Sequence, residues 1–318
     1  ANDCRYCPLR QEQDVRRCTL SPEETARVFL DYHGRREVFG LFLSSGVVGT
    51  PDATMERLNA TARILRAKHQ FKGYIHLKVI PGASEAAIDE AVSLASAVSL
   101  NIETPGARRL ARLSSRKDYL RDIIGPIKRI SELTAKGTRF AKVKQTTQFI
   151  VGPAGESDSE IVKYMWGLYD RLRLHRIYFS AYQKALGDPL LSAQPSESQG
   201  QEGLASRPGD LLMREHRLYQ VDFLMRKYGF TDADILYDEG GYLSLEIDPK
   251  EGWATRHPEF FPVQVNKASR SELLRVPGLG PVTVNRIVEL RRTQQVRDLE
   301  QLGRVGARLE KARSYLSF

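Results

Sequence analysis

Two cysteines separated by two residues stand near the start of the sequence, in the segment Cys4-Arg5-Tyr6-Cys7. Thiolates at this spacing are common ligands of zinc and of iron–sulfur clusters. The remaining cysteine, Cys18, lies at no spacing that would complete a zinc site, and the sequence has no second cysteine pair. The pair therefore predicts a metal-binding or iron–sulfur loop, with half a zinc site as the less favoured alternative.

A regular alternation of short apolar strands and amphipathic helices follows the cysteine pair. A first helix is predicted from the capping box at Ser21 to about His33. Strands are predicted at 38–44, 73–80, 97–103, 146–152 and 176–182, and further helices at 52–70, 84–95, 116–136 and 156–173. This alternation predicts an α/β fold with a parallel sheet that is closed or partly closed into a barrel.

One face of the predicted strands is repeatedly polar. In the strand 73–80, Tyr74, His76 and Lys78 alternate with aliphatic residues. The other strands repeat the pattern with Ser99, Asn101, Glu103, Gln148, Tyr178, Ser180 and Tyr182. Strands that helices cover on both faces are almost entirely apolar, so the pattern predicts a barrel interior that holds a polar ligand near the strand ends. The alternative is an open sheet with one solvated face.

The bulk composition limits the classes of protein to consider. A chain of 318 residues with 41% hydrophobic content can bury one large core and that of a small additional domain. The sequence has no apolar run of about 18 residues and no signal-peptide pattern, and its few cysteines favour the cytoplasm. A net charge of +9 favours a polyanionic partner such as nucleic acid.

The chain is predicted to divide into three parts, 1–190, 191–262 and 263–318. The middle part begins with a polar, turn-rich loop, continues with a helix at about 211–228, and ends in a mixed linker region, all expected to pack on the barrel. Arg214 and His216 on that helix are expected either to close over the barrel interior or to cap the helix against solvent.

The third part contains a Gly-x-Gly turn between two helical segments, in Val276-Pro277-Gly278-Leu279-Gly280. This arrangement resembles the helix-hairpin-helix family, a small all-α domain that binds the nucleic-acid backbone rather than the bases. Glycines permit the tight turn and let backbone N–H groups approach a phosphate. The resemblance implies a nucleic-acid site made by Gly278, Gly280, Thr283 and Arg286, with a degenerate second hairpin within 299–316. The alternative is a packing or protein-contact module.

Cys4 and Cys7, with the aromatic Tyr6 between them, resemble the end of the Cys-x3-Cys-x2-Cys loop of radical S-adenosylmethionine (SAM) enzymes. In that family three thiolates hold a [4Fe–4S] cluster and SAM binds the fourth iron. The resemblance implies both cofactors and a partial (β/α)6 TIM-type barrel. The first cluster cysteine and the first barrel strand are expected upstream of Ala1.

The same resemblance implies roles for residues at the strand ends. Contacts with SAM are expected from Tyr6, Ser44, Ser45, Gly46, Asn101, Glu103 and Gln148. Lys78 and Tyr182 are the predicted catalytic residues, as substrate contacts or in radical quenching, and His76 and Ser180 are further candidates. The alternative for Asn101 and Glu103 is that they only pair with Lys78 inside the barrel.

Segments along nearly the whole chain, including Leu41–Gly46, His76–Lys78 and Arg214–Gln220, resemble one subgroup. This subgroup is the DNA modification/repair radical SAM proteins, often paired with a uracil-DNA-glycosylase-like protein. The resemblance implies a 5′-deoxyadenosyl radical that modifies or repairs DNA, and an electron donor such as flavodoxin or ferredoxin. The alternatives are an enzyme that acts on RNA and a non-catalytic DNA-binding adaptor that recruits the glycosylase-like partner.

Overall fold

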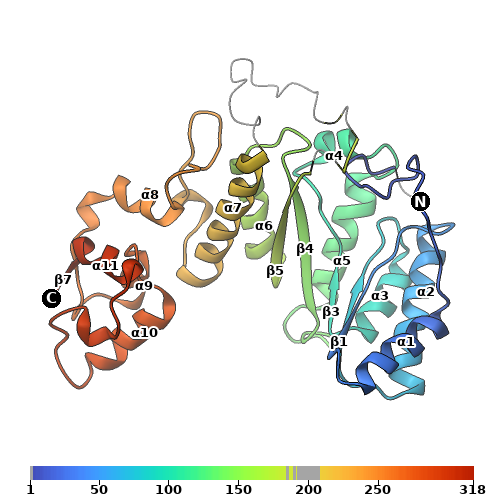
Figure 1. Ribbon diagram of the computed structural model, residues 1–318, viewed down its shortest axis with the longest axis horizontal. Coiled ribbons are helices and arrows are strands. Elements are labelled where there is room, and N and C mark those ends of the chain that lie inside the picture. The colour runs from blue at the N-terminus through green and yellow to red at the C-terminus, as the bar shows by residue number, and fades with distance from the viewer. Residues whose placement is uncertain (1–2, 184–185, 189–190, 192–207) are drawn as a thin grey trace. The chain divides into compact units, whose positions relative to one another are not determined.

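The computed structural model of the protein describes residues 3–183, 186–188, 191 and 208–318. The chain forms two compact units, residues 1–211 and 212–318 (Figure 1). The polar stretch predicted at 192–209 lies almost entirely outside the described residues. The second unit therefore holds the helix-hairpin-helix segment together with about fifty residues before it.

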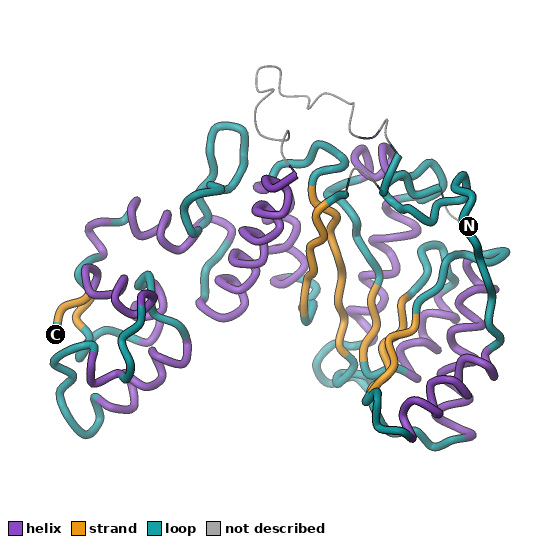
Figure 2. Tube along the Cα trace, in the orientation of Figure 1, coloured by secondary structure: helices purple, strands orange, loops and turns teal. Residues whose placement is uncertain are grey.

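The first unit is built on a parallel sheet of five strands in sequential order (Figure 2). The strands are β1 (Gly40–Leu43), β2 (Tyr74–Lys78), β3 (Ala97–Ser99), β4 (Lys144–Val151) and β5 (Arg176–Ala181). Each strand pairs with the next one along the chain, and β1 and β5 are the two edge strands of the sheet. The predicted α/β fold with a partial parallel barrel is confirmed.

Helices connect the strands and cover one face of the sheet. They are α1 (Pro22–Gly34), α2 (Pro51–Arg63), α3 (Glu85–Leu94), α4 (Ala107–Leu113), α5 (Gly125–Leu133) and α6 (Asp158–Asp170). The predicted capping box is present, because the Ser21 hydroxyl accepts from the Glu24 N–H and the Glu24 carboxylate accepts from the Ser21 N–H. The predicted helix at 52–70 is also present, and its last turn is a π-helix, Ile64–Lys68.

The two faces of the sheet differ as the alternation predicts. Side chains on the helix-covered face, such as Ile75, Leu77 and Phe149, are fully buried. Residues paired in a parallel register share a face, and the opposite face carries Phe42 beside His76, and Gln148 beside Tyr178. We call this second surface the inner face. On it, Phe42 and Tyr178 are exposed, and His76 and Gln148 are half-buried.

The second unit contains most of α7 (Pro208–Tyr228) and four shorter helices with a small parallel sheet. These are α8 (Pro249–Arg256), α9 (Arg270–Arg275), α10 (Pro281–Leu290) and α11 (Ala307–Lys311), with β6 (Val263–Gln264) and β7 (Leu316–Ser317). Short 3-10 turns lie at Asp232–Asp234, Pro258–Phe260, Glu300–Leu302 and Ala312–Tyr315. The β6–β7 pairing adds two very short strands to a module expected to be all-helical.

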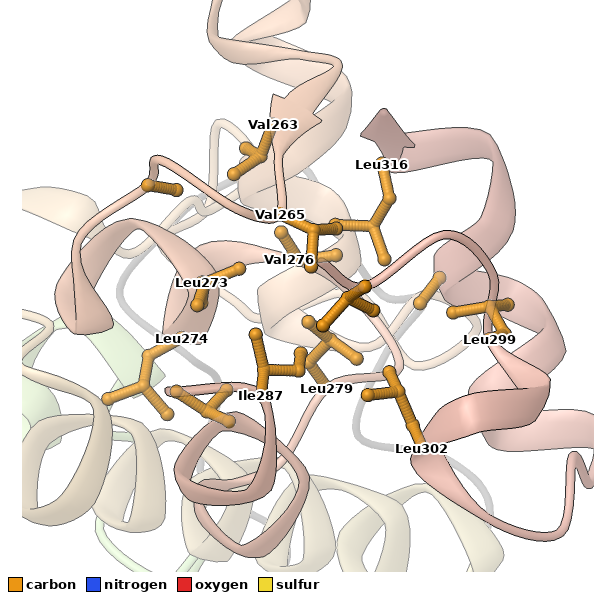
Figure 3. Packing of buried hydrophobic residues seen from close by; sticks show 14 residues of the cluster. Val263, Val265, Leu273, Leu274, Val276, Leu279, Ile287, Leu299, Leu302 and Leu316 are labelled. Atoms are coloured by element: carbon orange, nitrogen blue, oxygen red, sulfur yellow. The ribbon is translucent and has the colours of Figure 1, made fainter. Parts of the chain in front are cut away.

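A separate hydrophobic core stabilises the second unit. Val265, Leu273, Val276, Leu279 and Ile287 are buried there and point toward one another (Figure 3). The region 231–262, predicted as mixed with a linker, contributes an aromatic cluster in which Trp253 contacts Phe230, Phe260 and Phe261. These large rings bury enough apolar surface to form part of the unit rather than a linker.

Candidate functional site

The cysteine loop is held by chain segments that are distant in sequence. The Arg5 N–H donates to the Leu113 carbonyl at 2.9 Å, and the Arg5 carbonyl accepts from the Asp188 N–H at 2.7 Å. The Arg5 guanidinium also pairs with the Asp188 carboxylate at 2.8 Å. Asp3 adds hydrogen bonds to the hydroxyls of Ser114 and Ser115. The loop is therefore fixed from two sides.

A cavity of about 820 Å³ lies beside this loop, at the carboxyl ends of β1 and β2. This volume is near the upper end of the about 300–1,000 Å³ that small-molecule sites occupy. Its lining brings together most of the residues predicted from the sequence: Cys4, Tyr6, Cys7, Ser44, Ser45, Gly46, Lys78, Asn101 and Glu103. Residues from three strand ends and the cysteine loop thus face one space.

A buried chain of polar contacts runs along one wall of the cavity. The Lys78 ammonium donates to the Asn101 carbonyl oxygen, and the Asn101 amide donates to the Glu103 carboxylate at 3.4 Å. The Tyr6 hydroxyl donates to the other Glu103 oxygen at 2.7 Å. The pairing of Asn101 with Lys78, the alternative to a SAM contact, is thus present, and Glu103 also joins the strand ends to the cysteine loop.

The backbone of Glu103 is held in an uncommon conformation. Its φ of +67° lies in the left-handed region, which few non-glycine residues adopt. Strand β4 fixes this conformation, because the Glu103 N–H donates to the Gln148 carbonyl at 3.0 Å and its carbonyl accepts from the Ile150 N–H at 2.8 Å. Such strain persists only where the surrounding structure enforces it, and it concentrates at functional sites.

Lys117 completes this wall and was not predicted from the sequence. Its ammonium lies 3.6 Å from the Glu103 carboxylate and donates to the Tyr6 hydroxyl at 3.4 Å. Burial opposes the charged form of Lys117, but Glu103 and the Cys4 sulfur outweigh it and raise the pKa of the ammonium. In the sequence Lys117 is one of several basic residues around the start of the helix predicted at 116–136, with no signal that distinguishes it.

Burial shifts the pKa values of other groups on the inner face and in the cavity. It lowers the pKa of Lys78 to about 8, although Glu103 opposes this shift. Burial, with a contribution from Lys78, lowers the pKa of His76 to about 4. Burial also raises the pKa of the Cys4 thiol, against the effect of Lys117. With this pKa, His76 is neutral at physiological pH. Its Nε2 forms a hydrogen bond of 2.9 Å with the Ser99 hydroxyl.

Several predicted site residues lie outside the cavity lining. Gln148 is on the inner face of β4, and its carbonyl contacts Glu103 as described above. Tyr182 packs in an apolar cluster with Ile150 and Ala154, and its hydroxyl donates to the Asp188 carbonyl at 3.3 Å. Tyr6 packs against the same cluster. Tyr182 thus shares an apolar cluster with Tyr6 of the cysteine loop and is not part of the cavity lining.

Three more candidates lie outside the cavity lining. Ser180 pairs in register with Ile150 on the inner face of β5. In the second unit, the Arg214 guanidinium lies 4.8 Å from the centre of the Tyr242 ring, and His216 is exposed. Arg214 therefore contributes to packing within its own unit.

The two hairpin glycines serve different purposes. Gly278 has a φ of +85°, and a Cβ there would lie 2.3 Å from the Arg308 carbonyl oxygen, so its hydrogen is required for packing inside the unit. Gly280 is the N-cap of α10, has extended φ and ψ, and supplies no capping side chain. The first N–H groups of α10 therefore have no side-chain cap, the arrangement that favours an anion at a helix N-terminus.

The other hairpin residues predicted to bind nucleic acid are also placed. Thr283 is half-buried in the first turn of α10. The Arg286 guanidinium donates to the Leu302 carbonyl and so ties α10 to the second glycine turn. Lys250 supports the hairpin from within the unit, because its ammonium donates to the Leu279 carbonyl at 2.6 Å.

The donor set of the cysteine loop fits an iron–sulfur cluster in part. Cys4 and Cys7 are free thiols that line the cavity, and soft thiolates are the ligands such clusters require. The described residues contain no group of three or more His, Cys, Asp or Glu side chains placed to hold a metal ion. The loop therefore brings two thiols to the cavity, too few on their own to complete a cluster site among the described residues.

Comparison with known families agrees with this geometry. Residues 1–165 match the family model of the Radical SAM superfamily, and residues 260–316 match that of the Helix-hairpin-helix motif. Comparison with curated proteins gives no match. Among solved structures, the chain is similar to "Crystal structure of HydG: A maturase of the [FeFe]-hydrogenase", at 13% identity and a TM-score of 0.46. That similarity covers 70% of this chain and 47% of the other, about half its length.

Proposed function

The chain belongs to the radical SAM superfamily, whose enzymes use a [4Fe–4S] cluster and SAM, and we propose that it modifies or repairs DNA. When bound, the cluster and SAM together supply a 5′-deoxyadenosyl radical that removes a hydrogen atom from the substrate. Enzymes of this superfamily require an electron donor, and we propose flavodoxin or ferredoxin for this role. As to localisation, none of the described helices has the length and apolar character needed to cross a bilayer.

We propose that Cys4 and Cys7 hold the cluster and that the cavity beside them holds SAM. In this proposal Tyr6, Ser44, Ser45, Gly46, Asn101, Glu103 and Gln148 bind and orient SAM. Glu103 and Asn101 provide oxygen acceptors for the polar groups of SAM, while the Lys117 ammonium, 3.6 Å from Glu103, helps to position that carboxylate. Lys78, at the end of β2, contacts the substrate, and Tyr182 supports the cysteine loop from behind.

The helix-hairpin-helix unit carries the proposal that the substrate is nucleic acid. Such hairpins bind the phosphate backbone through helix N-termini, and α10 has N–H groups without a side-chain cap. The net charge of +9 supports the same class of partner. In this proposal Gly280 and Thr283 approach the phosphate, whereas Gly278 and Arg286 maintain the hairpin. A uracil-DNA-glycosylase-like protein is the proposed protein partner.

Anaerobic reconstitution tests this function. The full-length protein is loaded with iron and sulfide, reduced, and supplied with SAM and DNA. We expect 5′-deoxyadenosine by chromatography and a mass change in DNA nucleosides after digestion. Cys7→Ala should abolish both products while leaving DNA affinity unchanged. DNA binding with no consumption of SAM would instead support the non-catalytic adaptor, and a mass change in RNA alone would identify RNA as the substrate.

A further inference from the structure

The inner face of the sheet exposes aromatic side chains that the proposed cofactor site does not use. Phe42 on β1 is 58% exposed, Tyr74 on β2 is 46% exposed and Tyr178 on β5 is 39% exposed. Large aromatic side chains that remain exposed on a sheet face are typical of a binding surface rather than of a core. Their distribution over three strands makes this a surface and not one isolated residue.

The strands that carry Phe42 and Tyr74 lead into the cavity. The ring of His76 lies 4.6 Å from that of Phe42 and 6.3 Å from that of Tyr74, both nearly perpendicular to it. Along the chain, Phe42 is followed by Leu43 and Ser44, which line the cavity, and Lys78 lines it two residues after His76 on the same face. Because burial keeps His76 neutral, the group presents uncharged rings at physiological pH.

The cavity itself carries an excess of positive charge. Among the described residues that line it, six are cationic and Glu103 is the single carboxylate; the cations are Arg10, Arg16, Arg17, Arg57, Lys78 and Lys117. Arg17 donates to backbone carbonyls of its own loop. Arg16 is exposed, and no hydrogen bond or ion pair involves it among the described residues.

Two further arginines that line the cavity have guanidinium nitrogens that donate to no protein acceptor among the described residues. Arg57 uses one nitrogen to donate to the Leu20 carbonyl at 2.9 Å. Arg10 is buried, and its Nε has no hydrogen-bond partner; the nearest carboxylate, that of Glu12, lies at 3.8 Å. Guanidinium groups with unused donors are suited to phosphate, which accepts several hydrogen bonds at once. The arginines are therefore suited to the phosphate of a nucleotide, and the aromatic residues to its base.

We propose that the inner face binds one unpaired nucleotide of the substrate, with its base on the aromatic surface that Phe42, Tyr74 and Tyr178 form together and its phosphate at Arg16 and Arg57. This inference rests on the proposed function and specifies its substrate class. Atoms of a paired base are inaccessible inside the duplex stack, so the target nucleotide is single-stranded or flipped out of the helix. Aromatic stacking tolerates every base, because each base has a π-face.

Binding to labelled oligonucleotides tests this proposal without any turnover. The full chain is titrated with a single strand, a perfect duplex, and a duplex with one unpaired 2-aminopurine, whose fluorescence falls on stacking. We expect the unpaired probe to bind more tightly than the perfect duplex and to be quenched. Phe42→Ala and Tyr178→Ala should each weaken binding of the unpaired probe by about tenfold and reduce quenching.

Matched controls separate stacking and charge from general effects. Tyr32→Ala removes an exposed tyrosine from α1, outside the sheet, and should leave binding unchanged. Arg16→Gln removes one phosphate contact and should reduce the slope of log affinity against log salt by about one. Arg27→Gln, on α1, removes the same charge and should leave that slope unchanged.

Each remaining outcome has a distinct meaning. Equal affinity for paired and unpaired probes, unaffected by the aromatic substitutions, would overturn the inference while leaving DNA as the proposed substrate. Absence of any DNA binding by the wild-type chain would overturn the proposed function as well. If Phe42→Ala weakened binding of the perfect duplex as much as binding of the unpaired probe, the surface would not select unpaired bases. That result would also overturn the inference.

Discussion

Glu103 connects more parts of the candidate site than any other residue described above. Its carboxylate accepts from Tyr6 in the cysteine loop and from Asn101, and lies 3.6 Å from the Lys117 ammonium. Both side chains of the pair with Lys117 are only 6% exposed, so each charge depends on the other for compensation. Removal of either charge alone should therefore lower the free energy of unfolding.

We predict that Glu103→Gln lowers the free energy of unfolding by about 3 kcal/mol, because it leaves the buried Lys117 charge without its partner. Urea unfolding followed by circular dichroism measures the change. Lys117→Met in the same background should restore part of the loss, since it removes the uncompensated charge. A double variant as unstable as the sum of the two single variants would contradict this coupling.

Lys250 predicts a dependence of stability on pH in the second unit. Burial lowers its pKa from 10.5 to about 7, so between these values the unfolded chain binds its proton more tightly than the folded chain. The contribution of Lys250 to the free energy of unfolding should therefore rise as the pH increases from about 7 toward 10, and be constant below 7.

Urea unfolding at several pH values, in wild type and Lys250→Met, measures this contribution. The difference in stability between the two proteins should change with pH in favour of the wild type as the pH rises. The exposed Lys267 provides a control, because Lys267→Met should leave the pH dependence unchanged. Parallel pH profiles for wild type and Lys250→Met would contradict the prediction.

For single residues, the sequence predicts which side chains line the cavity better than it predicts their hydrogen bonds and ion pairs. Period-2 alternation is a local signal, and the polar residues that it singled out, Lys78, Asn101 and Glu103, line one cavity, although β3 ends at Ser99, before the last two. The burial of Lys117 has no local signal, because it depends on packing between the cysteine loop and a segment more than one hundred residues later. The individual roles of Tyr6, Asn101 and Gln148 toward SAM stay predictions.

Among the elements, the hairpin before α10 gives the sharpest test of its own geometry. Gly278→Ala should lower the free energy of unfolding by about 1–3 kcal/mol or more, because a Cβ at φ +85° is strained and meets the Arg308 carbonyl. Gly280→Ala should be tolerated, since its Cβ would meet only the Tyr228 hydroxyl at 3.5 Å and its φ is extended. Thermal unfolding of both variants measures the difference, and equal losses would contradict it.

The elements were predicted well where local signals are strong. Five strands and the capped helices followed from apolar periodicity and capping residues. The predicted helix at 116–136 is instead a π-helical turn, Tyr119–Ile124, followed by α5, because Pro126 has no N–H to donate. Helix α4 was missed because it has only seven residues and its N-cap is Gly106, which provides no capping side chain.

For the whole molecule, the positive charge predicts how DNA binding depends on salt. The affinity for DNA should fall steeply with salt, since binding releases counterions from the phosphates. Arg304 is exposed in the second glycine turn of the hairpin unit, and Arg304→Gln should reduce the slope of log affinity against log salt by about one. Arg27→Gln gives a protein of the same net charge and should leave the slope unchanged. Equal slopes for both variants would indicate that bulk charge alone determines binding.

The attachment of the cysteine loop has a consequence for the order in which the protein matures. Cys4 and Cys7 are synthesised before the segments that fix their loop, around Leu113 and Asp188, which leave the ribosome more than one hundred residues later. During synthesis, which proceeds at about 5–20 residues per second, the thiols therefore pass several seconds without their anchors. The loop proposed to hold the cluster therefore acquires both of its anchors only after the last strand of the sheet has been made.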